Sequence, residues 1–483
     1  MGIETTAIVT MAAVVGFYMA WNIGANDVAN AMGTSVGSKA LTLGKAILIA
    51  GVFEFAGAFL AGSHVTNTVR KGIVDISLFA EADNGARILM YGMLAAPLGA
   101  GVWLQLATYF GRPVSTTHSI IGAIVGFAVA AGGAYAVEWS KIWLIVISWV
   151  ASPLMSGTIA AATFLTIQRL MINVPDPVKG TKRWAPLFVF LVLSILTLVT
   201  LFKGLKNLHL DLPFGAALLY ASVIGFIGAG VGGVLIRRVR IPATSSGGSM
   251  PIAAMADDLR SMVRYARRLR AKASNGAVEH VETLEGSLEA LTHLAAENEA
   301  EARTRGEFVF VEKVFAYLQI LSACFVAFAH GANDVANAIG PVSAVVSLAG
   351  GGTEALSGKA PVPLWVLLLG GVGIVVGLSM WGWRIIRVIG EKITELTPTR
   401  GFSAEFAAAT TIVLASRLGI PISTTHTLVG GVMGVGFARG LASMNSKVLR
   451  DIFISWLLEL PVAAGLAAGF FFIIKFAFET FGA

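Results

Sequence analysis

Two stretches of the sequence place carboxylate and amide side chains inside otherwise apolar segments. The string "GANDVANA" occurs at residues 24–31 and again at residues 331–338. Within each copy, two Asn residues four positions apart share one helix face. Carboxylates, amide oxygens and carbonyls freed by a helix break are hard oxygen ligands that suit Na⁺, and an Asp can instead carry H⁺. The predicted cation-binding residues are Asn26, Asp27, Asn30, Asn333, Asp334 and Asn337, with Asp27 and Asp334 as the Na⁺ ligands. The plainer interpretation is that these groups satisfy one another in helix packing.

A second repeated motif supplies hydrogen-bond donors. "PVSTTH" spans residues 113–118 and "PISTTH" spans 421–426. Pro favours the first turn of a helix, and free amides, hydroxyl groups and the positive end of the helix dipole form an anion site there. Two such helix starts that face each other suit a tetrahedral oxyanion such as phosphate. The predicted phosphate-binding residues are Ser115, Thr116, Thr117, Ser423, Thr424 and Thr425. Hydroxyl groups that simply bond back to their own helix are the alternative.

Further polar side chains accompany these motifs. His118 and His426 end the second motif, and we favour a structural role over donation to substrate. Glu54, Glu405 and Glu459 lie within apolar segments, and the first two have no acidic counterpart in the other copy, so they are candidates for ion transport or for buried pairing with Lys or Ser. No Cys/His metal spacing, phosphate-binding loop or nucleophile elbow is present, so we expect no enzyme activity and no cofactor other than the coupling ion.

The elements that position these residues must cross a membrane. Hydrophobic residues make up 56% of the chain and charged residues 13%, about half the charged share of a soluble domain. Because a crossing helix needs about 20 apolar residues, we predict an all-α protein with about twelve transmembrane helices. They lie near residues 5–37, 42–63, 87–110, 114–134, 141–171, 185–203, 213–236, 313–347, 362–389, 402–418, 421–439 and 450–478. The first and eighth are overlong and contain "GANDVANA", so both are expected to be broken.

The repeated motifs belong to a duplication. "SKIWLIVISW" at 140–149 also pairs with "SKVLRDIFISW" at 446–456, so three blocks recur in the same order. Seven predicted spans separate the two starts, and an odd number inverts the second copy in the membrane. Inverted-topology repeats with broken helices are typical of secondary transporters, although passive channels can also arise by duplication.

One polar interval divides the chain into residues 1–236, 237–312 and 313–483. The middle part predicts a helical hairpin, basic in its first helix and acidic in its second. Its predicted seam consists of Met255, Leu259, Met262, Ala266, Leu269, Val281, Leu284, Leu288, Leu291 and Ala295. Arg237 and Arg238 place this part in the cytoplasm and, by counting spans, both termini outside. The net charge of +7 belongs to such loops, so no nucleic-acid partner is expected.

The duplicated "GANDVANA" and "P-x-STTH" resemble the inorganic phosphate transporter (PiT) family over residues 17–171 and 313–478. The resemblance implies a homodimer in the cell (inner) membrane that carries phosphate with Na⁺ or H⁺ by alternating access. It also implies roles for the Asn, Asp and Ser/Thr residues given above, and for Glu54 and Glu405. Thr34 and Ser35 have no matching hydroxyl pair in the second copy, so the site should be only pseudo-symmetric. A sulfate or other oxyanion permease is the alternative, and an intramembrane hydrolase is a remote one.

Overall fold

A computed structural model shows that the protein is built from helices. It describes residues 3–62, 74, 79, 84–199, 201, 212–239, 256–271, 277–350, 362–417, 422–440 and 444–481. Across these residues the only β structure is a pair of isolated bridges, Val74 with Val137 and Thr394 with Met444. The all-α prediction is therefore confirmed.

The helices of the first half are α1 (Ile3–Gly37), α2 (Leu43–Ala61), α5 (Gly85–Tyr109), α6 (Thr116–Gly132), α7 (Trp139–Ile167), α8 (Pro177–Val199) and α9 (Phe214–Arg238). The rest are α10 (Ala256–Arg270), α11 (Val278–Ala349), α12 (Leu364–Arg387), α13 (Pro398–Arg417), α14 (Thr424–Arg439) and α15 (Ser446–Phe481). Short π-helical turns, Gln168–Ile172 and Val388–Lys392, extend α7 and α12.

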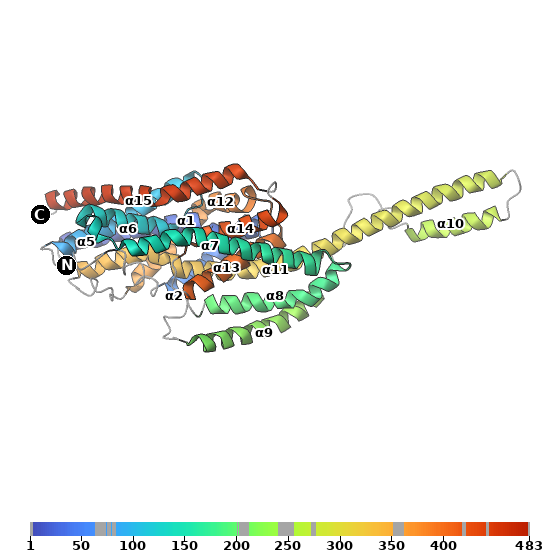
Figure 1. The fold of residues 1–483 in the computed structure, drawn as a ribbon, viewed down its shortest axis with the longest axis horizontal. Helices are drawn as coiled ribbons and strands as arrows, with labels where there is room; N and C mark the ends of the chain where they lie inside the picture. The colour runs from blue at the N-terminus through green and yellow to red at the C-terminus, as the bar shows by residue number, and fades with distance from the viewer. Residues whose placement is uncertain are drawn as a thin grey trace. The chain divides into compact units, whose positions relative to one another are not determined.

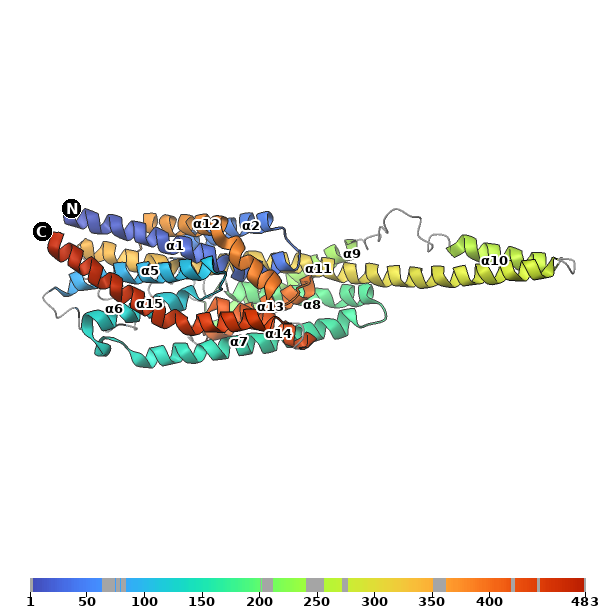
Figure 2. The same cartoon turned by 90° about the horizontal axis from the view of Figure 1, so that it is seen from above.

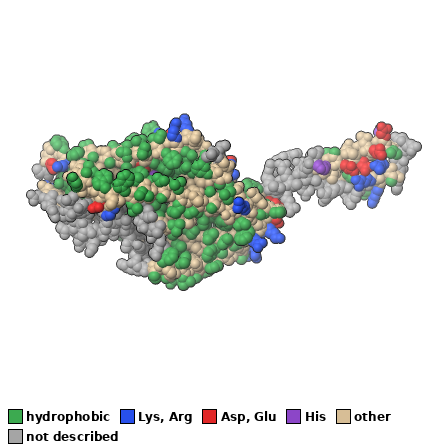
Figure 3. All heavy atoms as spheres, in the orientation of Figure 1, with side chains coloured by type: hydrophobic (Ala, Val, Ile, Leu, Met, Phe, Trp, Pro, Cys, Tyr) green, Lys and Arg blue, Asp and Glu red, His purple; other side chains and the backbone are tan. Residues whose placement is uncertain are grey.

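Nine helices in the described part of the chain are long and apolar enough to cross a membrane. The other three predicted spans correspond to α6, α13 and α14, which are shorter or less apolar. The 17 residues of α6 rise about 25 Å, which is less than the roughly 30 Å of a bilayer core. Large apolar side chains such as Trp143, Leu154 and Phe226 are exposed, and hydrophobic atoms cover much of the visible face of the bundle (Figure 3).

The expected breaks in the first and eighth spans are wrong, because α1 and α11 run through "GANDVANA" as unbroken helices. The glycines serve close helix packing instead. A Cβ atom at Gly24 would lie 2.0 Å from the Ile374 carbonyl oxygen, and one at Gly331 would lie 2.1 Å from that of Glu54. Figures 1 and 2 both show α1 alongside α12. The chain leaves the helical path at the second motif, between α5 and α6 and between α13 and α14.

Corresponding helices of the two copies pack in corresponding ways. A Cβ atom at Gly126 in α6 would lie 2.1 Å from the Ala464 carbonyl oxygen in α15. At the matching place, a Cβ atom at Gly434 in α14 would lie 2.0 Å from the Gly157 carbonyl oxygen in α7. The repeat seen in the sequence is thus also a repeat of helix contacts.

The chain forms two compact units, one of residues 1–168, 186–233 and 315–483 and one of residues 169–185 and 234–314. In the second unit α10 lies beside the start of α11 (Figures 1 and 2). Arg267 donates to Glu285 at 3.1 Å and to Glu289 at 2.7 Å, and these bonds raise the pKa of Arg267. The division at residues 236 and 312 stays a prediction.

The seam of this hairpin differs from the predicted one. Leu259 and Ala266 are buried as expected, and Leu288 packs against Leu259. Val263, which was not predicted to lie in the seam, is buried, whereas the adjacent Met262 is exposed. The predicted seam residues Met262, Leu269, Leu284 and Leu291 are exposed. Met255 and the side chain of Ala295 lie outside the described residues. Glu285 is buried in this seam, and its carboxylate pairs with Arg267 at 3.1 Å and Arg270 at 3.2 Å.

Candidate functional site

The two "STTH" motifs begin helices in the same way. Ser115 is the N-cap of α6, and its hydroxyl oxygen accepts the His118 backbone N–H at 3.2 Å. Ser423 caps α14 through the His426 N–H, also at 3.2 Å. The placement of Pro113 in the first helical turn is wrong, because this residue lies two positions before the cap. Pro421 lies outside the described residues.

Asn26 of α1 binds the connection between α5 and α6. The Asn26 side chain donates to Thr108 Oγ1 at 2.8 Å and to the Arg112 carbonyl at 3.3 Å. Its oxygen accepts the Val114 N–H at 3.2 Å. The Val114 carbonyl lies 3.1 Å from the hydroxyl of Thr425, at the start of α14. The two helix starts therefore meet inside the bundle, and Asn26 positions one of them.

The amides of the two "GANDVANA" copies reach across to the opposite "STTH" motif. Asn30 Nδ2 donates to Thr425 Oγ1 at 2.9 Å, with Thr424 Oγ1 at 3.4 Å. Asn337 Nδ2 donates to Thr117 Oγ1 at 3.3 Å, with Thr116 Oγ1 at 3.5 Å. These residues occupy matching positions in the repeat. We call α5–α6 the first hairpin and α13–α14 the second hairpin. Asn30 of the first "GANDVANA" therefore binds the second hairpin, and Asn337 of the second copy binds the first hairpin.

Asp27 lies between the two helix starts and is buried. Thr116 Oγ1 donates to its carboxylate at 2.7 Å. Thr425 Oγ1 lies 3.3 Å from the other carboxylate oxygen, and its single hydrogen can go either there or to the Val114 carbonyl. Asp27 thus joins the predicted cation residues to the predicted phosphate residues.

His330, which was not among the predicted site residues, lies close to three carboxylates. His330 Nε2 lies 2.8 Å from Asp334 Oδ2 and 3.6 Å from Asp27 Oδ2. Its Nδ1 lies 3.4 Å from Glu54 Oε1. Asn333 Nδ2 donates to the other oxygen of Asp334 at 2.7 Å. Asp27, His330 and Asp334 offer ligand atoms close enough together to hold one metal ion.

The place that corresponds to the His330–Glu54 contact in the repeat is apolar. Ile23 precedes the first "GANDVANA" as His330 precedes the second. The contacts of Gly24 with Ile374 and of Gly331 with Glu54 make Ile374 the counterpart of Glu54. Ile23 and Ile374 are both buried, and they correspond in the repeat to His330 and Glu54. The substitution of His for Ile between two otherwise matching copies is the signal that would have found His330.

Glu405, from α13, lies apart from the Asp27 cluster in its own polar surroundings. Its carboxylate accepts hydrogen bonds from Ser35 at 3.1 Å, from Gln319 at 3.3 Å, and from Thr34 and Ser322. All five side chains are buried. Thr34 and Ser35, the hydroxyl pair without a match in the second copy, are therefore used here.

His118 and His426 lie behind the helix starts, and their ring centroids are 4.8 Å apart. Glu459 of α15 completes this cluster, with Oε2 at 3.9 Å from His426 Nε2. The two imidazoles thus contact each other rather than Asp27 or Asn30. The predicted structural role of the two histidine rings stays a prediction.

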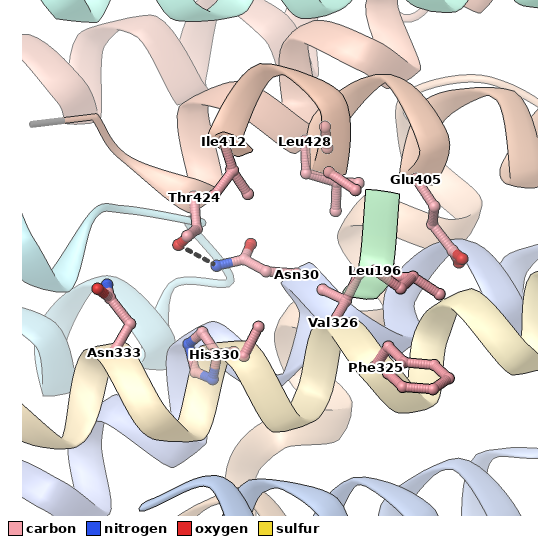
Figure 4. A pocket seen from close by; sticks show the side chains of 13 residues that line it. Asn30, Leu196, Phe325, Val326, His330, Asn333, Glu405, Ile412, Thr424 and Leu428 are labelled. Atoms are coloured by element: carbon pink, nitrogen blue, oxygen red, sulfur yellow. Dashed lines mark hydrogen bonds between the residues drawn. The ribbon is translucent and has the colours of Figure 1, made fainter. Parts of the chain in front are cut away.

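A pocket opens beside the site, and its lining includes Asn30, His330 and Glu405. Figure 4 shows Asn30 bonded to Thr424, with His330 and Asn333 projecting from α11 and Glu405 further along the pocket. The matching residues Asn337 and Thr116 are not among the residues that line this pocket.

Known proteins resemble this chain over nearly its whole length. The model of the phosphate transporter family matches residues 23–467. Inorganic phosphate transporter 2-1, chloroplastic, of Arabidopsis thaliana is 44% identical over 94% of this chain and 70% of its own length. A solved structure described as the sodium-dependent phosphate transporter is 37% identical, with a TM-score of 0.73, over 97% of this chain and 99% of its own.

Proposed function

The chain belongs to the phosphate transporter family, and we propose that it imports inorganic phosphate with Na⁺ by alternating access at the meeting point of its two hairpins. The observation that carries this proposal is the reciprocal crossing of Asn30 to the second hairpin and Asn337 to the first. A site assembled from both halves can be rearranged by moving the halves, which is what alternating access requires. The solved relative is sodium-dependent by its description, which favours Na⁺ over H⁺.

The anion is bound by the helix starts of α6 and α14. Thr116, Thr117, Thr424 and Thr425 offer hydroxyl groups there, and the backbone N–H groups of both first turns add to them. Ser115 and Ser423 already accept bonds as N-caps, so their part is to fix these first turns. The donors approach from two sides, as a tetrahedral anion with four oxygens requires.

The cations are bound by carboxylates of α1 and α11, which carry the two "GANDVANA" copies. Asp27 lies against both helix starts, and Asp334 shares His330 Nε2 with it. Oxygen ligands from Asp, Asn and Thr suit Na⁺. Glu405 places a further carboxylate along the pocket that leads to this centre.

Coupling is needed because phosphate is an anion. It carries one or two negative charges at neutral pH, and a negative-inside membrane opposes its entry by about 2.3 kcal/mol per charge per 100 mV. Two cations, at Asp27 and Asp334, would neutralise a doubly charged phosphate. A third cation would make the voltage itself drive uptake.

The topology proposed from the basic loops does not depend on whether the short helices cross the whole membrane. Each hairpin, α5–α6 or α13–α14, enters and returns, so it counts as an even number of crossings whether or not it reaches the far side. The termini then remain outside and the 237–312 segment inside. In this topology the C-terminal end of α1, with Thr34 and Ser35, lies toward the cytoplasm.

The function is tested with purified protein in liposomes. Uptake of ³²P-phosphate should follow an imposed Na⁺ gradient and should not follow a pH gradient alone. Unlabelled sulfate in excess should leave this uptake unchanged. Competition by sulfate would favour the broader oxyanion permease, and uptake driven only by the pH gradient would replace Na⁺ by H⁺.

Matched variants test the site itself. Asn30→Ala and Asn337→Ala each remove one of the reciprocal contacts, and both should raise the KM for phosphate. Thr158→Ala, an exposed hydroxyl on α7, serves as the control. Unchanged KM in both Asn variants would contradict the proposed site. The homodimer implied by the family resemblance stays a prediction, which mass photometry in detergent would test.

A further inference from the structure

We propose that His118, His426 and Glu459 form a binding site for a transition-metal ion of the Zn²⁺ class. The three residues come from α6, α14 and α15. One ligand atom from each lies within 4.8 Å of the others, and all three side chains are buried. Two imidazoles and one carboxylate are a familiar zinc ligand set that leaves a fourth position for water or an anion.

Several of the proposed ligand atoms lack a hydrogen-bond partner in the described part of the protein. Among the described residues, His118 Nδ1, both ring nitrogens of His426 and Glu459 Oε2 are buried without a hydrogen-bond partner. Buried polar atoms of this kind are rare, because each loses its hydrogen bonds to water on burial. A metal ion at this place would satisfy one atom of each residue. Imidazole nitrogen selects Zn²⁺, Co²⁺ or Ni²⁺ over Na⁺ and Mg²⁺, so this is not a second sodium site.

Neighbouring residues hold the three ligands in place. Ser119 donates to Glu459 Oε1 at 3.0 Å, which leaves Oε2 directed at His426. Trp456 stacks on the His426 ring at a centroid distance of 3.7 Å, and Trp149 lies 4.8 Å from the His118 ring. Fixed rings and an oriented carboxylate are what a metal centre requires of its surroundings. The cluster is also asymmetric, because Ser152 of α7 stands where α15 has Glu459.

The position of the ion would affect transport. His118 and His426 each follow directly on the Thr pair of their own motif, so an ion bound to both would fix the distance between the two helix starts. On the proposed function, which this consequence presupposes, the halves must rearrange in every cycle. Bound Zn²⁺ should therefore inhibit phosphate uptake, whereas the binding site itself does not depend on the transport mechanism.

Direct binding to the full-length protein in detergent is the first test. Metal-free protein in phosphate-free buffer is titrated with Co²⁺, whose visible absorption reports four-coordinate nitrogen and oxygen ligands, and Zn²⁺ is then used as competitor. We expect one tight Co²⁺ site per chain. Binding should weaken by at least about 10- to 100-fold in His118→Gln, in His426→Gln and in Glu459→Gln. Wild-type protein without such a site would overturn the proposal.

Three controls separate this cluster from other ligands. His330→Gln removes the imidazole of the other candidate cluster and should leave the Co²⁺ spectrum unchanged. His280→Gln with His293→Gln removes two exposed imidazoles of the α10–α11 segment and should do the same. Loss of the spectrum in His330→Gln, with retention in His118→Gln, would place the metal elsewhere. If a His variant does not fold, Glu459→Gln carries the test, with size-exclusion elution as the criterion of folding.

Transport gives the second readout. Na⁺-driven ³²P-phosphate uptake should fall in micromolar Zn²⁺ and recover on addition of a chelator. In Glu459→Gln the remaining uptake should tolerate at least about tenfold more Zn²⁺. Tight binding without inhibition would keep the site but remove its effect on the cycle. Absence of Na⁺-driven uptake in untreated protein would instead count against the proposed function and leave the Co²⁺ result standing.

Discussion

The two halves match at Asn30 and Asn337 and differ about two helical turns away, at Ile23 and His330. Asn30 and Asn337 hold opposite hairpins through matching Thr residues. Near them, His330 of the second half contacts Glu54 of the first, whereas Ile23 and Ile374 occupy the positions that correspond to these two in the repeat. The matched part is suited to an anion that must be held from both sides. The unmatched part is suited to ions that must be handled differently on the two sides.

The largest effect on uptake is expected from substitution of the two aspartates. Asp27 takes hydroxyl contacts from both hairpins, whereas Asp334 contacts Asn333 and His330. Because each hydrogen bond to a charged group contributes about 1.5–3 kcal/mol, Asp27→Asn should reduce Na⁺-driven uptake by more than about 100-fold. Asp334→Asn should reduce it less. Initial rates of ³²P uptake, at equal amounts of monodisperse protein, measure both, and equal losses would show that the centre is more symmetric than its contacts.

Glu405 offers the next largest effect, since it has no acidic counterpart. Glu405→Gln replaces the charged acceptor of four donors by a neutral amide. Because one charged hydrogen bond is worth about 1.5–3 kcal/mol, uptake at low Na⁺ should fall about 10- to 100-fold. The Na⁺ dependence of uptake is the measurement, and Ser38→Ala, which removes a hydroxyl bonded to Gln319, is the control. A uniform loss at every Na⁺ concentration would argue that Glu405 only supports the fold.

The matched helix contacts can be tested through the glycines. A Cβ atom at Gly24 or at Gly331 would press against a carbonyl oxygen of a neighbouring helix, at 2.0 and 2.1 Å. Overpacking of this kind costs about 1–3 kcal/mol. Gly24→Ala and Gly331→Ala should therefore lower the melting temperature of the detergent-solubilised protein by similar amounts. Gly230→Ala, which meets open space on α9, should not. A large difference between the first two variants would refute equivalent packing.

The smallest expected effect concerns the unmatched pair. His330→Ile and Glu54→Ile together place at this contact the same apolar pair that Ile23 and Ile374 form at the corresponding place. Each single variant leaves one buried polar group without its neighbour, so the double variant should be less impaired than the sum of the two losses. Contacting residues typically show coupling of about 0.5–3 kcal/mol. A double-mutant cycle on uptake rates measures it, and additivity would show that the pair does not act as a unit.

The sequence was informative wherever two copies could be compared. Repetition identified the Asn, Asp and Thr residues that the structure brings together, and it identified Thr34 and Ser35 as unmatched. It could not predict that α1 and α11 remain helical, because Gly between helices serves close packing as readily as a break. It also could not predict that Asn26 would bind backbone groups of residues 112–114, since that contact depends on where a distant hairpin ends. The hairpin seam was misplaced because a buried Glu285 interrupts the apolar pattern.

The short non-helical connection before α6 has a consequence for biosynthesis. Backbone groups inside a bilayer need protein partners, and Asn26 supplies two of them for residues 112–114. The other partners arrive much later in the chain, since Thr425 lies at the Val114 carbonyl and Trp456 Nε1 donates to that of Pro113 at 3.1 Å. The first hairpin therefore cannot form all its hydrogen bonds while it leaves the ribosome. The carbonyl groups of Pro113 and Val114 lack these partners until the last helices have been inserted.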